Sequence, residues 1–384
     1  MHVELSAAQK ALRAELRDYF AGLVSPEERR AMLRERHGPV FREIVRRMGR
    51  DGRLGVGWPV EYGGQGFGEI EQHLFVDEAV RADVQLPSVT LQTVGPTLQQ
   101  YGTDEQKSFF LPKILAGEIH FAIGYTEPEA GTDLAALRTT AVRDGDEYVV
   151  NGQKIFTTGG HDADYIWLAV RTAPDAPRHK GISILIMDTS DPGYSWTPII
   201  TCDGAHHVNA TYYSDVRVPV NRLVGKENEG WRLITTQLNH ERVMLGPAGR
   251  IGGLYDRVRA WAAAHGLLDL ADVRAVLAET WAVTRVNELL NWQVAVSSAS
   301  APVAVADASA TKVFSSEVIQ RIGRNLEELV GRHGDLADPD TAELAEWLDV
   351  AAKRNIVLTF GGGVSEIQRE LIASIGLGLP RVPR

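Results

Sequence analysis

A carboxylate occupies a position where an apolar residue is expected, in the helix predicted around residue 240. Trp231, Ile234 and Leu238 follow the spacing of one apolar helix face. Glu241 takes the next position on that face. Burial disfavours the charged form of a carboxylate and raises its pKa towards neutrality, where a general base works well. The alternative interpretation is an ion pair between Glu241 and Arg242 or another cation at the helix edge, because structural pairs also perturb pKa values.

A polar loop with the sequence T-E-P-E-A-G-T-D, beginning at Thr126, is the second candidate for chemistry. Thr126 and Thr132 offer hydroxyl groups beside flexible Gly131, a composition that suits hydrogen bonding to a ligand. Downstream, the D-G-D turn at residues 144–146 and the N-G turn at residues 151–152 predict two hairpins, and hence a β-meander. The alternative is an ordinary surface hairpin without a ligand.

The elements that position these residues fall into three segments. Helical patterns dominate residues 1–120, strand patterns residues 121–225, and helical patterns residues 226–384. We therefore predict an α+β protein with an N-terminal all-α domain, a middle β-barrel or β-sandwich domain and a C-terminal α-helical domain. Residues 164–170 and 181–187 read as buried strands. No strand–G-x-G-x-x-G–helix unit or Walker A motif is present, which argues against a Rossmann or P-loop nucleotide site.

Composition narrows the class of protein and its partners. The chain has 384 residues, 44% of them hydrophobic, and a net charge of −10, which argues against nucleic acid and anionic membrane as main partners. Cys202 is the single cysteine, so an internal disulfide is excluded and a reducing compartment is favoured. No apolar run of membrane-spanning length and no cluster of metal ligands is recognised. We expect a cytoplasmic protein without a metal site.

Two motifs resemble the flavin-binding core of the acyl-CoA dehydrogenase family: T-E-P-x-A-G-[ST]-D, and N-G-x-K-x-[WF]-x-T, here N-G-Q-K-I-F-T-T. The helix L-N-H-E-R-V-M-L resembles L-D-L-E-R-x-x-L of the isovaleryl-CoA type, in which that glutamate is the base. Most members place the base in a C-terminal Y-E-G-T-S-x-I-Q-R motif. This chain has F-G-G-G-V-S-E-I-Q-R there, so Gly362 stands in place of the usual base.

The resemblance implies an FAD-dependent enzyme that dehydrogenates the α,β bond of an acyl-CoA thioester. Glu241 would remove the α-proton, and the β-hydrogen would leave as hydride to flavin N5. A backbone N–H at Gly362 would polarise the thioester oxygen. The implied cofactor-binding residues are Tyr125, Thr126, Gly131, Thr132, Phe156, Thr157, Thr158, Ser365 and Glu366. The implied substrate-binding residues are Thr132, Asn239, Arg242 and Gly362, with Asn239 replacing an aspartate that usually binds the CoA portion.

Two further family segments are absent. R-x-x-F-G should follow Gly249, and Q-x-x-G-G-x-G should precede the glycine run, but neither sequence occurs. In homotetrameric members these segments hold the adenosine half of FAD in a neighbouring subunit. The chain thus resembles one subunit of the α2β2 dehydrogenases of actinobacteria that act on steroid (cholesterol) side-chain CoA thioesters. The implied partners are a homologous subunit, completing a heterotetramer, and an electron-transfer flavoprotein.

Two other functions are compatible with parts of the pattern. The first is a homo-oligomeric dehydrogenase for short or branched acyl-CoAs, although its Q-x-x-G-G-x-G segment is lacking. The second is a non-catalytic subunit that completes the site of another chain. Glu241 and the retained flavin-ring motif argue against this second function.

Overall fold

The computed structural model describes residues 4–244, 246–300 and 305–380, without the side chains of residues 238–244 and 297–300. Helices come first, eight strands follow, and helices return to the end of the described chain. The predicted α+β class and the order helices–strands–helices are confirmed. Within the described ranges, no helix combines the length and the apolar character needed to cross a membrane. The domain boundaries at residues 120 and 225 stay a prediction.

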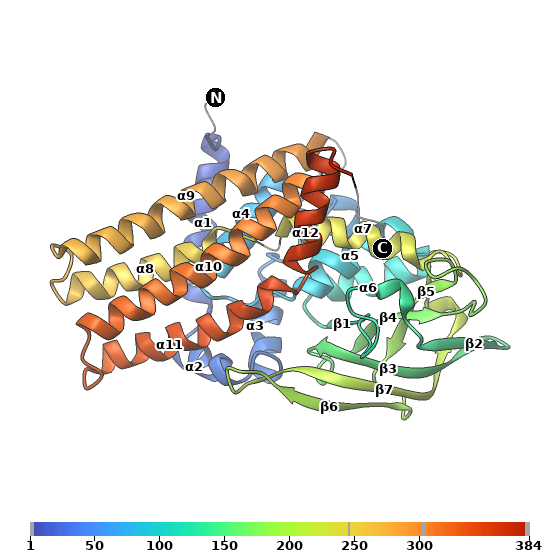
Figure 1. Ribbon diagram of the computed structural model, residues 1–384. Coiled ribbons are helices and arrows are strands. Elements are labelled where there is room, and N and C mark those ends of the chain that lie inside the picture. Colours follow the sequence, from blue (N-terminus) through green and yellow to red (C-terminus); the bar gives the residue numbers. More distant parts are fainter. Residues whose placement is uncertain (1–3, 245, 301–304, 381–384) are drawn as a thin grey trace. The chain divides into compact units, whose positions relative to one another are not determined.

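The strands form one mixed sheet with the order β6-β7-β3-β2-β4-β5-β8, and β1 pairs with β4 in parallel. Figure 1 shows β2, β3, β7 and β6 side by side. The predicted buried strands are β4 and β5, whose interior positions are all buried. The strands are β1 Phe121–Gly124, β2 Thr140–Asp144, β3 Glu147–Thr158, β4 Tyr165–Arg171, β5 Ile182–Asp188, β6 Tyr194–Ile200, β7 His206–Pro219 and β8 Leu223–Val224.

One of the two predicted hairpins is present and the other is wrong. The D-G-D turn joins β2 to β3, with Asp144 opposite Glu147. The Asn151-Gly152 pair makes no turn, because β3 continues through it and pairs with β7 on both sides. Here the ladder register shifts between Val150 and Gly152, and Gly152 has a φ of +150°. A Cβ at Gly152 would lie 2.7 Å from the Thr139 hydroxyl oxygen, so the glycine serves a bulge rather than a hairpin.

The chain packs as two compact units. One contains residues 1–26, 67–86 and 241–384, and the other contains residues 27–66 and 87–240. The first unit is helical, and its long helices α8, α9, α10 and α11 pack on one another (Figure 1). Its elements are α1 Ala7–Leu23, α4 Glu69–Arg81, α8 Gly249–Ala264, α9 Ala271–Ser300, α10 Val305–His333, α11 Pro339–Asn355, the 3₁₀ turn η5 Ile356–Thr359, α12 Ser365–Leu371 and the π-turn η6 Ile372–Gly376.

The second unit contains the sheet and its own helices. These are α2 Pro26–Arg34, α3 Pro39–Arg50, the 3₁₀ turn η1 Val60–Tyr62, the π-turn η2 Val89–Val94, α5 Gly95–Tyr101, α6 Asp104–Leu115, the 3₁₀ turns η3 Leu134–Ala136 and η4 Val220–Arg222, and most of α7 Gly230–Met244. Leu233, Ile234 and Gln237 of α7 are buried. The division between the units falls within α7, between residues 240 and 241.

Candidate functional site

A buried ion pair joins the two motifs that sequence analysis singled out. Lys154 Nζ on β3 lies 2.8 Å from a carboxylate oxygen of Glu127 and 3.1 Å from the carbonyl oxygen of Tyr125, to which it donates. Glu127 also accepts from the backbone N–H groups of Arg138 (2.7 Å) and Thr139 (2.9 Å) and from the Thr139 hydroxyl (2.6 Å). The pair therefore fastens the loop that begins at Thr126 to β3.

Burial and the opposite charge of the partner both shift the pKa values of this pair. Burial lowers the pKa of Lys154 to about 8, against the opposing effect of the Glu127 carboxylate. Burial acts to raise the pKa of Glu127, but the charge of Lys154 and the hydrogen bonds outweigh it and lower that pKa. Sequence reasoning missed the pair. The feature that could have revealed the pair is Lys154 itself, a charged residue at a position of β3 that faces the interior.

A second buried network connects this loop to α7. The Tyr125 hydroxyl donates to Gln237 Oε1 and accepts a hydrogen bond from Trp167 Nε1 at 3.1 Å. Gln237 Nε2 donates in turn to the Thr97 hydroxyl at 3.1 Å. The hydroxyl and the carbonyl of Tyr125 are thus both engaged within the protein, and its role in cofactor binding stays a prediction.

Phe156 has a backbone conformation that non-glycine residues rarely adopt. Its φ is +59°, its side chain is 60% exposed, and it lies at a register shift between Lys154 and Thr157. Such conformations are destabilising and cluster at functional sites. Thr158 is also exposed, whereas Thr157 is buried with its hydroxyl 3.1 Å from that of Thr211. An exposed aromatic ring and an exposed hydroxyl two residues apart are compatible with the predicted contact to a flavin ring.

The loop itself is held by its backbone and offers free polar groups. The Thr126 carbonyl accepts from the Ile155 N–H at 2.8 Å, and residues 127 and 130 exchange two backbone hydrogen bonds of 3.1 Å. Gly131 and Thr132 are exposed, and the Thr132 hydroxyl has no hydrogen-bond partner within the described residues. A hydroxyl beside an unhindered glycine fits the phosphate end of a flavin.

The C-terminal glycine run belongs to the helical unit. Gly362 and Gly363 have φ values of +69° and +100°, a conformation that side chains disfavour. A glutamate at Gly362 would therefore be strained. The Ser365 hydroxyl is buried and donates to the Thr359 carbonyl at 3.1 Å, whereas Glu366 is exposed in the first turn of α12.

Three predicted site residues lie on the last part of α7. The backbone of Asn239, Glu241 and Arg242 is helical, as predicted. Their side chains lie outside the described residues, so their roles stay predictions.

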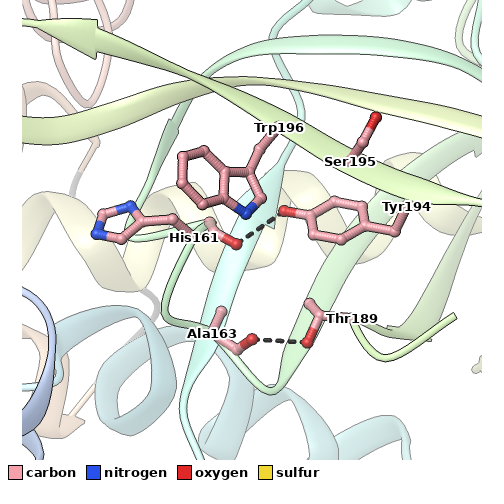
Figure 2. A pocket seen from close by; sticks show the side chains of 7 residues that line it. His161, Ala163, Thr189, Tyr194, Ser195 and Trp196 are labelled. Atoms are coloured by element: carbon pink, nitrogen blue, oxygen red, sulfur yellow. Dashed lines mark hydrogen bonds between the residues drawn. The ribbon is translucent and has the colours of Figure 1, made fainter. Parts of the chain in front are cut away.

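The second unit also contains a hollow that no predicted site residue lines. It has a volume of about 360 Å³ and is lined by Gly160, His161, Ala163, Thr189, Tyr194, Ser195 and Trp196 (Figure 2). The Tyr194 hydroxyl donates to the Gly160 carbonyl at 2.8 Å, and the Thr189 hydroxyl donates to the Ala163 carbonyl at 2.7 Å. Burial lowers the pKa of His161, which favours its neutral form.

Comparison with known proteins shows that one family matches nearly the whole length of the chain. Three family models match in succession: acyl-CoA dehydrogenase N-terminal domain at residues 6–118, middle domain at residues 122–216 and C-terminal domain at residues 228–377. Acyl-CoA dehydrogenase FadE29 of Mycobacterium tuberculosis is 67% identical over 389 residues, and the match covers 100% of both chains.

Two solved structures are similar over the full length of this chain. A chain of the "Tcur3481-Tcur3483 steroid ACAD" has a TM-score of 0.93 and 49% identity, with 100% of both chains covered. A chain of the ChsE4-ChsE5 complex from Mycobacterium tuberculosis has a TM-score of 0.90 and 49% identity, with 100% of both chains covered.

Proposed function

Because the chain belongs to the acyl-CoA dehydrogenase family, we propose that it dehydrogenates a steroid-CoA thioester with a shortened side chain. The family consists of flavin-dependent oxidoreductases that use FAD. One observation carries the steroid assignment: the full-length similarity, at 49% identity, to a structure named as a steroid acyl-CoA dehydrogenase. The proposed pathway is the β-oxidation of a cholesterol-type side chain.

Glu241 is the proposed base that takes the α-proton of the thioester. The alternative position for a base, Gly362, has no side chain and has a φ of +69°, which a glutamate adopts poorly. Glu241 is also the carboxylate that the sequence places on the apolar face of α7. The position of the base on α7 resembles the isovaleryl-CoA type of this family.

The remaining proposed roles are polarisation of the thioester and binding of the flavin. An α C–H is a weak acid, so a donor must stabilise negative charge on the thioester oxygen, and the Gly362 N–H is proposed for this. Thr126, Gly131, Thr132 and the exposed pair Phe156 and Thr158 would hold the flavin. FAD, when bound, supplies the hydride acceptor.

We propose further that the active assembly is an α2β2 heterotetramer with a homologous subunit. The chain lacks the R-x-x-F-G and Q-x-x-G-G-x-G segments that hold the adenosine half of FAD in homotetrameric members. The structures of high similarity are named as pairs of different proteins. An electron-transfer flavoprotein is the proposed electron acceptor.

Substrate choice tests the proposal. The assembly purified after co-expression should show a higher kcat/KM for a steroid propanoyl-CoA than for butanoyl-CoA or octanoyl-CoA. A clear preference for a straight chain would refute the steroid assignment and favour the short-chain alternative. Absence of flavin reduction by every thioester, in an assembly with flavin bound, would favour the non-catalytic role.

A further inference from the structure

Lys312 of α10 is a buried lysine that forms no ion pair within the described part of the chain. The residue is 2% exposed, and its Nζ donates to the carbonyl oxygens of Gly363 (2.8 Å) and Thr359 (3.3 Å). Burial lowers its pKa, although the charges of Glu366 and Glu317 oppose this. A buried ammonium group with only carbonyl partners is destabilising compared with an apolar side chain of similar length. Its presence therefore calls for a specific role.

The two carbonyls bonded to Lys312 belong to Thr359, two residues before the glycine run, and to Gly363, its last residue. Thr359 ends η5, and Gly363 precedes α12 by two residues, so neither carbonyl is within a regular helix. The Ser365 hydroxyl donates to the same Thr359 carbonyl at 3.1 Å. We define the glycine loop as residues 360–363. Lys312 bridges its two ends from a helix that the loop does not belong to.

Besides Lys312, a few short-range hydrogen bonds hold the loop. The N–H groups of Phe360 (3.1 Å) and Gly361 (2.8 Å) donate to the Val357 carbonyl, and Gln368 Nε2 donates to the Gly362 carbonyl at 3.5 Å. Three consecutive glycines have a wide choice of backbone angles, and no side chain of their own anchors them. A Cβ at Gly363 would lie 2.5 Å from Gln368 Nε2, so the loop also packs closely against α12. Holding both ends of the loop therefore helps to fix the direction of its backbone N–H groups.

We propose that Lys312 is a positioning residue, which holds the glycine loop so that the Gly362 N–H meets the thioester oxygen. This inference rests on the proposed function, in which that N–H stabilises the developing negative charge. A donor contributes to catalysis when it is already oriented before the charge develops. Lys312 supplies that orientation through the carbonyls of residues 359 and 363, without itself contacting the substrate.

The test compares Lys312→Met with the unsubstituted protein in the flavin-loaded assembly. Displacement of a catalytic group by about 1 Å costs about a hundredfold in rate, so kcat for steroid propanoyl-CoA should fall about a hundredfold. KM and flavin content should change little. Lys353→Met is the matched control, because Lys353 is a half-exposed lysine of α11 that pairs with Asp349. The control should keep normal kcat.

A spectroscopic readout separates positioning from general damage. The enoyl-CoA product, labelled with ¹³C at the thioester carbonyl, should show a carbonyl stretch at lower frequency when bound to the unsubstituted enzyme than in water. In Lys312→Met the frequency should move back towards the value in water. If Lys312→Met does not fold, Lys312→Gln, which keeps an uncharged N–H donor group, should show an intermediate frequency and an intermediate kcat.

Normal kcat together with a normal carbonyl frequency in a folded Lys312 variant would overturn the inference and leave the proposed function intact. Failure of the unsubstituted assembly to reduce its flavin with any acyl-CoA would refute the proposed function, and this inference with it. The two failures are therefore distinguishable.

Discussion

Replacing Lys154 by methionine should destabilise the sheet-containing unit strongly. Methionine has a similar length and no charge, so the change removes the ammonium group while filling most of its volume. Glu127 would remain buried, with donors from Arg138 and Thr139 but without a cation. Removing one partner of a buried ion pair costs about 3–5 kcal/mol. We expect a loss of this size in the free energy of unfolding.

A double substitution tests whether the loss comes from the pair. In Glu127→Gln/Lys154→Met no charge is buried, and the glutamine oxygen can still accept from Thr139. This variant should recover much of the stability lost in Lys154→Met, with a coupling energy within the ~0.5–3 kcal/mol found for residues in contact. Lys353→Met, which breaks an exposed i,i+4 pair, should cost only about 0.3–0.5 kcal/mol.

The assay combines chemical denaturation with hydrogen exchange. The backbone N–H groups of Arg138 and Thr139 donate to Glu127, so their exchange reports the pair directly. Lys154→Met should accelerate exchange at both residues and should also weaken flavin binding. A loss of stability of less than ~1 kcal/mol, the scale of an exposed pair, would refute the reasoning. So would additive effects of the two substitutions.

Three other predictions follow from the site and the fold. Glu241→Gln should retain flavin but reduce it with substrate several orders of magnitude more slowly, and near-normal reduction would contradict the assignment of the base. Burial lowers the pKa of His37 to about 3 from an ordinary value near 6.5, so below pH 6.5 the unfolded state binds a proton that the folded state does not. The free energy of unfolding should thus fall by up to ~1.4 kcal/mol per pH unit from pH 6.5 towards 3. His37→Gln should reduce this slope. Identical dependence of stability on pH in the two proteins would exclude His37 as the cause. The chain expressed alone should bind FAD poorly. The co-expressed assembly should contain two flavins per tetramer, measured by absorbance and native mass. A homotetramer of this chain with four FAD would contradict the proposed need for a partner subunit.

The sequence predicts the fold correctly where the local turn signal and the pairing of the strands favour the same structure. The D-G-D turn connects strands that are neighbours in sequence and in the sheet, so its residues contain the necessary information. Asn151-Gly152 has an equally strong turn signal, yet pairing with β7, more than 50 residues away, keeps β3 extended through it. The glycine was informative, but it indicated a bulge rather than a reversal of the chain.

The family motifs indicate candidate site residues, whose roles stay predictions, but they do not indicate the buried lysines that hold those segments. Phe156, Thr158 and Thr132 carry motif positions and are exposed. Lys154 and Lys312 read in the sequence as ordinary charged residues, because their partners are distant in the chain: Glu127 for Lys154, and the carbonyls of residues 359 and 363 for Lys312. Periodicity identifies which face of an element is buried, but it does not identify the hydrogen-bond partners on that face.

The positive φ of Phe156 has a consequence for laboratory evolution. A left-handed backbone costs a non-glycine residue about 1–2 kcal/mol, and its exposed ring recovers little of this by burial. A library selected only for resistance to heat should therefore enrich glycine or asparagine at position 156. A library selected for turnover should keep an aromatic residue there. Opposite outcomes of the two selections would mark position 156 as a site where stability has been exchanged for activity.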